Sequence, residues 1–144
     1  MNLAELIADL YTNLLFVIKK IAKKNNISSS QLLCVYAIPS EGISQSDLAK
    51  ILCLDLSTLS RNLDKLLFKK IDNKTHSSLD HRKQTVILTD KGEKLYIQIL
   101  YDLNQALNML YDFSDNSDDF DTIINSISQF NWLLCKKRYK DVSF

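Results

Sequence analysis

The sequence contains very little glycine and proline, with two Gly and one Pro in 144 residues. Sharp irregular turns usually need one of these residues, so few such turns are expected. The chain should therefore be mainly helical. Its length suits one compact domain with its own hydrophobic core, and we expect residues 1–144 to form that single domain.

Long apolar runs and a disulfide framework are also missing. No uninterrupted apolar run approaches the roughly 20 residues that a membrane-spanning helix needs, so no membrane partner is expected. The N-terminal segment carries Glu5 and Asp9 and has no signal-peptide pattern. The three cysteines are odd in number and widely spaced, which favours reduced thiols. Together these features predict a cytoplasmic protein.

A strong excess of one charge is absent too, because the formal net charge is +1. The distribution is more informative than the total. Residues 55–94 carry nine basic and six acidic side chains, whereas residues 95–144 carry four basic and seven acidic ones. A solvated surface could carry the modest basic excess of the middle segment, and so could a surface that binds an anionic partner.

The first helix is predicted over residues 3–24. Apolar residues recur along it at alternating spacings of four and three: Leu3, Ile7, Leu10, Leu14, Val17 and Ile21. This heptad-like seam would follow roughly 33 Å of helix. One small domain cannot bury so long a stripe well, so a partner helix from a second copy of the chain is expected.

Two helices separated by a short break form a helix-turn-helix pattern. Ser44 is the expected N-cap of the first helix, and Asp47 three residues later completes a capping box. Residues 53–55 break this helix, and the second runs from about Leu56 to Lys69. The apolar residues expected on its inner face are Leu56, Leu59, Leu63, Leu66 and Leu67.

A hairpin and two long helices are predicted after this pattern. The strands cover residues 71–77 and 84–88. Thr89 then caps a helix that extends to about residue 112, and a last helix begins at Ser117. A hairpin that directly follows a helix-turn-helix is typical of the wing in winged-helix proteins.

The outer face of the second helix is small, polar and basic, and the hairpin tip is basic. Hydroxyl, amide and guanidinium groups match base edges and phosphates in a major groove, and arginine suits a narrow minor groove. Each feature alone is compatible with a solvated surface, but the two features together favour a surface that binds DNA. The candidate DNA-binding residues are Ser57, Thr58, Ser60, Arg61, Asn62, Lys65, Arg82 and Lys83.

No enzyme, cofactor or metal site is predicted. The sequence offers no convergent nucleophile, base and orienting group, and no glycine-rich phosphate loop. His76 and His81 could suggest a metal, but a strand residue and a tip residue without a cysteine in register form a weak signal.

Four segments in the block from Ile27 to Leu95 are informative together: ISSSQLLCVYAI, EGISQSDLAKIL, DLSTLSRNLDKL and LDHRKQTVILTDKG. The last contains Asp80, Arg82, Leu88, Thr89 and Gly92. The block resembles the MarR family of bacterial transcription regulators. Its first three segments resemble the family's second helix and helix-turn-helix, and the last resembles the family's wing signature.

The resemblance implies a mainly α fold in which residues 28–94 form a winged helix-turn-helix lobe with a two-stranded wing. Residues 1–25 and 95–144 would be dimerisation helices. The implied protein is an obligate homodimer that binds a pseudo-palindromic site in double-stranded DNA, with the recognition helix in the major groove and the wing in the minor groove. It would act as a repressor by occluding a promoter, and Asp80 would orient the wing.

Family members often respond to small phenolic or lipophilic ligands, so the resemblance also implies a small-molecule effector. Its candidate contacts are Tyr11, Phe16 and Tyr36. Aromatic residues at helical spacing are also common in ordinary hydrophobic cores, and this alternative stays open.

The sequence departs from the family's pattern at two turns. Cys53 and Lys70 stand where the family usually has glycine. If the turns are kept, both residues need a positive φ, which costs about 1 kcal/mol each. These departures and the near-neutral charge support an alternative function, a winged-helix protein-interaction module that has lost specific DNA binding.

Overall fold

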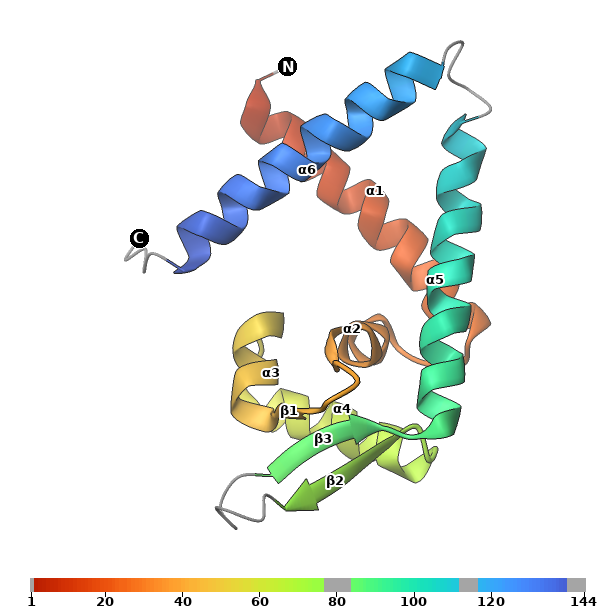
Figure 1. Cartoon of the computed structure of the whole chain (residues 1–144), viewed down its shortest axis with the longest axis vertical. Coiled ribbons are helices and arrows are strands. Elements are labelled where there is room, and N and C mark those ends of the chain that lie inside the picture. Colours follow the sequence, from red (N-terminus) through yellow and green to blue (C-terminus); the bar gives the residue numbers. More distant parts are fainter. Residues whose placement is uncertain (1, 77–83, 112–116, 140–144) are drawn as a thin grey trace. The chain divides into compact units, whose positions relative to one another are not determined.

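The computed structural model of the chain describes residues 2–76, 84–111 and 117–139 (Figure 1). The chain divides into two compact units, Met1–Asn104 and Gln105–Phe144. The helices are α1 (Leu3–Lys24), α2 (Ser29–Ala37), α3 (Gln45–Leu52), α4 (Leu56–Phe68), α5 (Asp90–Tyr111) and α6 (Ser117–Tyr139). The strands are β1 (Ile43–Ser44), β2 (Asp72–His76) and β3 (Gln84–Leu88). The mainly helical fold with a helix-turn-helix and a wing is therefore confirmed.

The first two helices begin at the side-chain caps that their sequences supply. The Asn2 side chain accepts a hydrogen bond from the backbone N–H of Glu5, and the Glu5 carboxylate accepts one from the Asn2 N–H. Ser28 and Gln31 form the same reciprocal pair at the start of α2. α2 ends before Pro39, and Ile38, the residue that precedes this proline, adopts an extended backbone.

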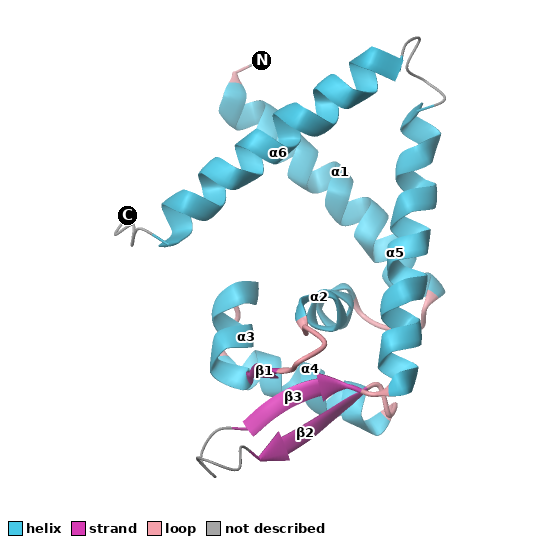
Figure 2. Cartoon of the chain, in the orientation of Figure 1, coloured by secondary structure: helices cyan, strands magenta, loops and turns pink. Residues whose placement is uncertain are grey.

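The sheet has three antiparallel strands in the order β1-β3-β2 (Figure 2). The two predicted wing strands are confirmed, and they pair from Asp72 opposite Leu88 to His76 opposite Gln84. The two-stranded prediction missed β1, which pairs Ile43 with Val86. A strand of two residues carries no alternation of apolar and polar side chains, so its sequence gave no signal.

Gly42 allows β1 to approach β3 closely. Its φ is +84°, and a Cβ at this position would lie 2.6 Å from Ile87 Cγ2 and 2.9 Å from Thr85 Cγ2. A residue with a side chain would meet both a disfavoured backbone and a steric clash there. The turn after Pro39 therefore needs this glycine to bring the chain from α2 to the sheet.

The core of the first unit lies where α2, α3 and α4 meet the sheet and the start of α5. Leu32, Val35, Leu48, Val86 and Ile99 are among its fully or almost fully buried members. On α4 the buried stripe consists of Leu59, Leu63 and Leu66, spaced four and three apart. This spacing places the remaining α4 side chains on the flanks or the outer face of the helix.

Two residues expected on the inner face of α4 are instead exposed. The exposed fractions are 55% for Leu56 and 41% for Leu67. Leu56 lies in the first turn of α4, before the buried stripe begins, and Leu67 lies one residue beyond Leu66. The predicted inner face was therefore too wide.

The predicted seam of α1 is buried only at its C-terminal end within the described residues. Ile21 and Ala22 belong to the core, and Val17 and Ile18 are half-buried against it. Toward the N-terminus the exposed apolar side chains are Leu3, Leu6, Leu10, Tyr11, Leu14 and Phe16. In the second unit, α6 likewise exposes Ile123, Ile124, Ile127, Trp132, Leu133 and Leu134.

Candidate nucleic-acid interface

The turn between α3 and α4 is closed by a residue in the left-handed region. Cys53 has a φ of 52°, and its N–H donates to the carbonyl oxygens of Ala49 and Lys50. The Leu54 N–H donates to the Ala49 oxygen at 3.0 Å. The same conformation recurs after α4, where Lys70 has a φ of 59°. The expectation that Cys53 and Lys70 need a positive φ is confirmed.

The N-terminus of α4 is capped by a carboxylate that also holds two hydroxyl groups. Asp55 accepts from the Thr58 backbone N–H at 2.8 Å and from the Thr58 hydroxyl at 2.7 Å. The Ser57 hydroxyl donates to the same carboxylate. These hydrogen bonds lower the pKa of Asp55, with those from the Ser57 and Thr58 side chains contributing most. The two hydroxyl oxygens are left as acceptors beside a fixed negative charge.

The structure places the predicted residues of α4 in two groups. Ser57, Arg61 and Lys65 are exposed on the outer face, spaced four residues apart, whereas Thr58 and Ser60 are half-buried. No described residue forms a hydrogen bond or ion pair with the side chain of Arg61 or of Lys65. The outer face therefore presents two available cations, one and two helical turns beyond Ser57.

Asn62 lies on the side of α4 that faces α2. Its Nδ2 donates to the Ser30 hydroxyl at 2.6 Å, and the residue is half-buried. One of its two N–H donors is thus used inside the lobe, where it braces α4 against the start of α2. Its predicted contact with a base stays a prediction.

The wing strand β2 is linked to α4 by an ion pair. The Lys74 ammonium lies 2.6 Å from the Asp64 carboxylate, and the Lys74 side chain is mostly buried. This contact holds β2 against α4. The predicted tip residues Asp80, Arg82 and Lys83 lie outside the described residues, so their roles stay predictions.

The end of α4, the root of the wing and the start of α5 are bonded together. The Thr89 hydroxyl donates to the backbone oxygen of Lys70 at 2.7 Å, and the Lys91 ammonium donates to that of Lys69 at 2.8 Å. A Cβ on Gly92 would lie 2.1 Å from the Ile71 carbonyl oxygen. The absent side chain of Gly92 thus lets α5 begin directly against the backbone of this junction.

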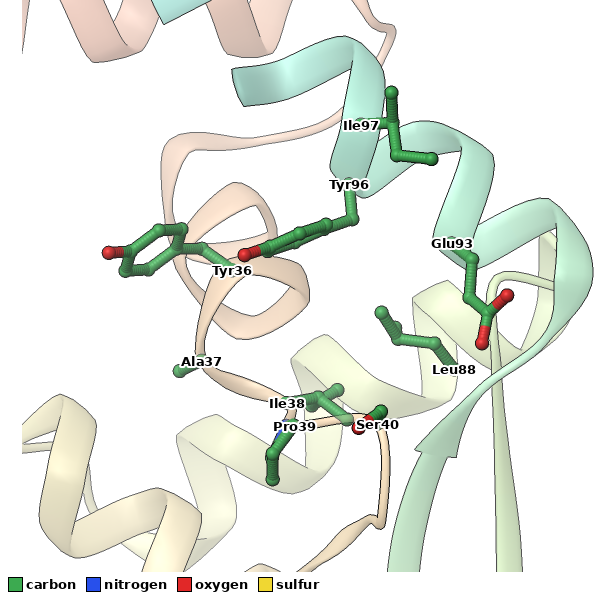
Figure 3. Close-up of a pocket in the computed structure, with 9 residues that line it drawn as sticks. All are labelled: Tyr36, Ala37, Ile38, Pro39, Ser40, Leu88, Glu93, Tyr96 and Ile97. Carbon is green, nitrogen blue, oxygen red and sulfur yellow. The ribbon is translucent and has the colours of Figure 1, made fainter. Parts of the chain in front are cut away.

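A cavity of about 630 Å³ lies beside this junction, within the first unit (Figure 3). It is lined by Tyr36, Ala37, Ile38, Pro39, Ser40, Leu88, Glu93, Tyr96 and Ile97. Tyr36, one of the predicted ligand contacts, contributes to it. Tyr11 and Phe16 do not line it; both are exposed on α1, and the Lys20 ammonium lies 4.8 Å from the centre of the Phe16 ring.

In the described part of the chain, no helix is both long enough and apolar enough to cross a membrane. Among the same residues, no three His, Cys, Asp or Glu side chains are grouped so that they could hold a metal ion.

No protein-family model and no curated protein sequence matches the chain, but many solved structures do. The chain is 22% identical to wild-type E. coli MarR in its apo form, with a TM-score of 0.80, and the match covers 90% of this chain and 96% of that one. Against the S. aureus MepR–DNA complex the identity is 19% and the TM-score 0.69, over 91% and 98% of the two chains. A MarR transcriptional regulator from Methanosarcina mazei Go1 is 25% identical, with a TM-score of 0.74 over 92% and 96%.

Proposed function

We propose that this chain, which has the fold of the MarR-type regulators, binds double-stranded DNA and regulates transcription as a homodimer. The observation that carries the proposal is the outer face of α4. It follows a helix-turn-helix turn, rests on three fully buried leucines, and exposes Arg61 and Lys65 without a partner among the described residues. A rigid helix with available cations and small polar side chains is suited to a major groove.

In this proposal the residues of α4 contact different parts of the DNA. Arg61 contacts a guanine or a phosphate, and Lys65 contacts a phosphate. The Ser57 and Thr58 hydroxyl groups donate their O–H to Asp55, so their oxygens accept hydrogen bonds from base amino groups. Ser60 and Asn62 complete the face. Arg82 and Lys83 at the wing tip enter the minor groove, and Asp80 orients that tip.

The exposed apolar stripe of α1 supports the homodimer. Leu3, Leu10 and Leu14 continue the seam whose C-terminal end is buried in the lobe. A second copy of α1 would cover it. Two lobes related by a two-fold axis would read a pseudo-palindromic site, and occupancy of a promoter would repress transcription. A small ligand would release the DNA.

The test is fluorescence anisotropy with the DNA upstream of the chain's own gene, and with a scrambled duplex of equal length as the control. If Arg61, Lys65, Arg82 and Lys83 engage phosphates in both protomers, the slope of log affinity against log salt should be about −7. Arg61→Ala should make the slope less steep by nearly 2 per dimer. Lys23→Ala, which removes the same charge from an exposed site on α1, should leave it unchanged.

A second candidate is a protein-interaction module that has lost specific DNA binding. Two features favour it: the negative charge of Asp55 at the N-terminus of α4, and the neutralisation of Lys74 by Asp64. Both reduce the positive potential over the recognition helix. A slope near zero on both duplexes would favour this candidate over the regulator.

A further inference from the structure

The cavity beside the junction of α2, the wing and α5 has the size and lining of a small-molecule site. Its volume of about 630 Å³ lies in the range of pockets that hold drug-sized ligands. One wall is Tyr36 at the end of α2, with the segment 37–40 that follows it (Figure 3). The other wall is Leu88 at the end of β3 together with Glu93, Tyr96 and Ile97 of α5.

The charged side chain in this lining is acidic. Glu93 is the only acidic residue among the nine lining residues, and none of the nine is lysine, arginine or histidine. The nearest basic neighbours in the sequence are Lys91, whose ammonium is bonded to the Lys69 carbonyl oxygen, and Lys94, which does not line the cavity. An anionic ligand would therefore meet a carboxylate without a lining counter-ion, whereas a cation would be attracted to it.

The aromatic residues favour the same class of ligand. Tyr36 and Tyr96 are stacked, with their ring centres 6.3 Å apart and their planes 23° from parallel. Figure 3 shows the two rings beside each other, one from each wall, with the Glu93 carboxylate apart from them on the other side of Leu88. Tyrosine faces attract cations, and their apolar surface suits a flat aromatic ligand.

We propose that this cavity binds an aromatic organic cation, with Glu93 as its counter-ion and Tyr36 and Tyr96 as its aromatic contacts. Binding itself needs only these residues. A regulatory effect of binding rests on the proposed function, because it requires that the chain bind DNA.

The cavity is placed so that its occupant acts on both DNA-reading elements. Its lining segment 37–40 leads into β1, and β1 ends at Ser44, the N-cap of α3. Leu88 ends the wing strand β3, and Thr89 ties that end to the backbone after α4. A cation that binds one arrangement of these walls better than another would shift the helix-turn-helix and the wing together.

The test compares three related probes by isothermal titration calorimetry at neutral pH. They are 1-methylquinolinium, which is a permanent cation, quinoline, which is neutral, and quinoline-2-carboxylate, which is an anion. The cation should bind about tenfold more tightly than quinoline, and the anion should bind most weakly. Binding of the anion as tightly as the cation, or no binding of the cation, would overturn the proposal.

Matched variants test whether Glu93 causes the preference for the cationic probe. Glu93→Gln keeps the shape of the side chain and should remove most of the preference for the cation. Asp90→Asn removes the same charge from the same turn of α5 outside the cavity lining, and should keep the preference. An unchanged preference in Glu93→Gln would refute the assignment. Tyr96→Leu should weaken the binding of 1-methylquinolinium more than the binding of quinoline.

Anisotropy with and without 1-methylquinolinium separates this proposal from the proposed function. The chain could bind 1-methylquinolinium in a way that depends on Glu93 and yet bind no DNA duplex. That result would support the site and count against the regulator. Salt-dependent DNA binding in a chain that does not bind 1-methylquinolinium would support the regulator and overturn the site.

Discussion

Asp72 is a buried carboxylate at the root of the wing, and it makes a sharp prediction about pH. The residue is 1% exposed, and neither side-chain oxygen has a hydrogen-bond partner in the described structure. Burial raises the pKa of Asp72 to about 6 from its usual 3.8. The charged groups that act on it are Lys74, which lowers this pKa, and Asp64, which raises it. Cys34 shares the buried environment, and burial raises the pKa of its thiol to about 12.

The sign of the effect follows from the direction of this shift. The folded chain binds the Asp72 proton more tightly than the unfolded chain does, so protonation stabilises the fold. That stabilisation is fully present below the unfolded pKa of 3.8 and is lost as the pH rises through about 6. A shift of about two units corresponds to about 3 kcal/mol of the free energy of unfolding.

The assay is urea denaturation of the parent chain and of Asp72→Val at about pH 4 and about pH 7, at one fixed protein concentration. Valine suits a buried strand position and removes the titrating group. We expect the variant to be more stable than the parent by about 3 kcal/mol at the higher pH, and expect this difference to shrink by a similar amount at the lower pH. Asp72→Asn should also remove the pH dependence, with a smaller gain because its amide is buried too.

The control is Asp9→Asn, which removes a carboxylate from an exposed position on α1. It should keep the pH dependence of the parent. If the difference in stability between Asp72→Val and the parent is the same at both pH values, the reasoning about a buried, unpaired carboxylate is refuted.

Three other predictions concern stability and assembly. Gly92→Ala should destabilise the chain by roughly 2 kcal/mol or more, measured by urea denaturation, because its Cβ would clash with the Ile71 carbonyl oxygen; a neutral effect would contradict the described junction. Cys53→Gly and Lys70→Gly should each stabilise the chain by about 1 kcal/mol, because both residues have a positive φ. Thermal unfolding at fixed protein concentration measures this gain, and a lower melting temperature in either variant would contradict it. Leu10→Lys should convert the proposed homodimer into monomers in analytical ultracentrifugation without unfolding the lobe, and a variant that stays dimeric would argue against the α1 seam as an interface.

Local chemical signals allowed much of the fold to be predicted. The caps Ser44 and Thr89 mark helix starts, because each side chain accepts a hydrogen bond from a backbone N–H three residues further along the chain. The positive φ of Cys53 and Lys70 was expected from the resemblance to the MarR family, which usually has glycine at these two positions. These features depend on near neighbours in the chain, so they can be read in sequence order.

The features that sequence missed depend on distant neighbours. The strand β1 exists because β3 lies beside it, and the contact between Asn62 and Ser30 joins residues 32 positions apart. The burial of Asp72 was also missed, because an aspartate at the start of a strand carries no local mark of what will cover it. The cavity is another such case, since its walls come from α2, β3 and α5.

The two left-handed residues at the ends of α4 have a consequence for redesign of the recognition helix. Cys53 closes the turn before α4, and Lys70 closes the chain after it, so the helix is framed at both ends by backbone geometry and not by its outer side chains. Substitutions at Arg61 and Lys65, which lie outside the Asp55 cap, would therefore change the chemistry of the outer face without shifting the helix in its frame. Libraries that vary only these positions would therefore change the side chains on the outer face of α4 and leave the rest of the fold unchanged.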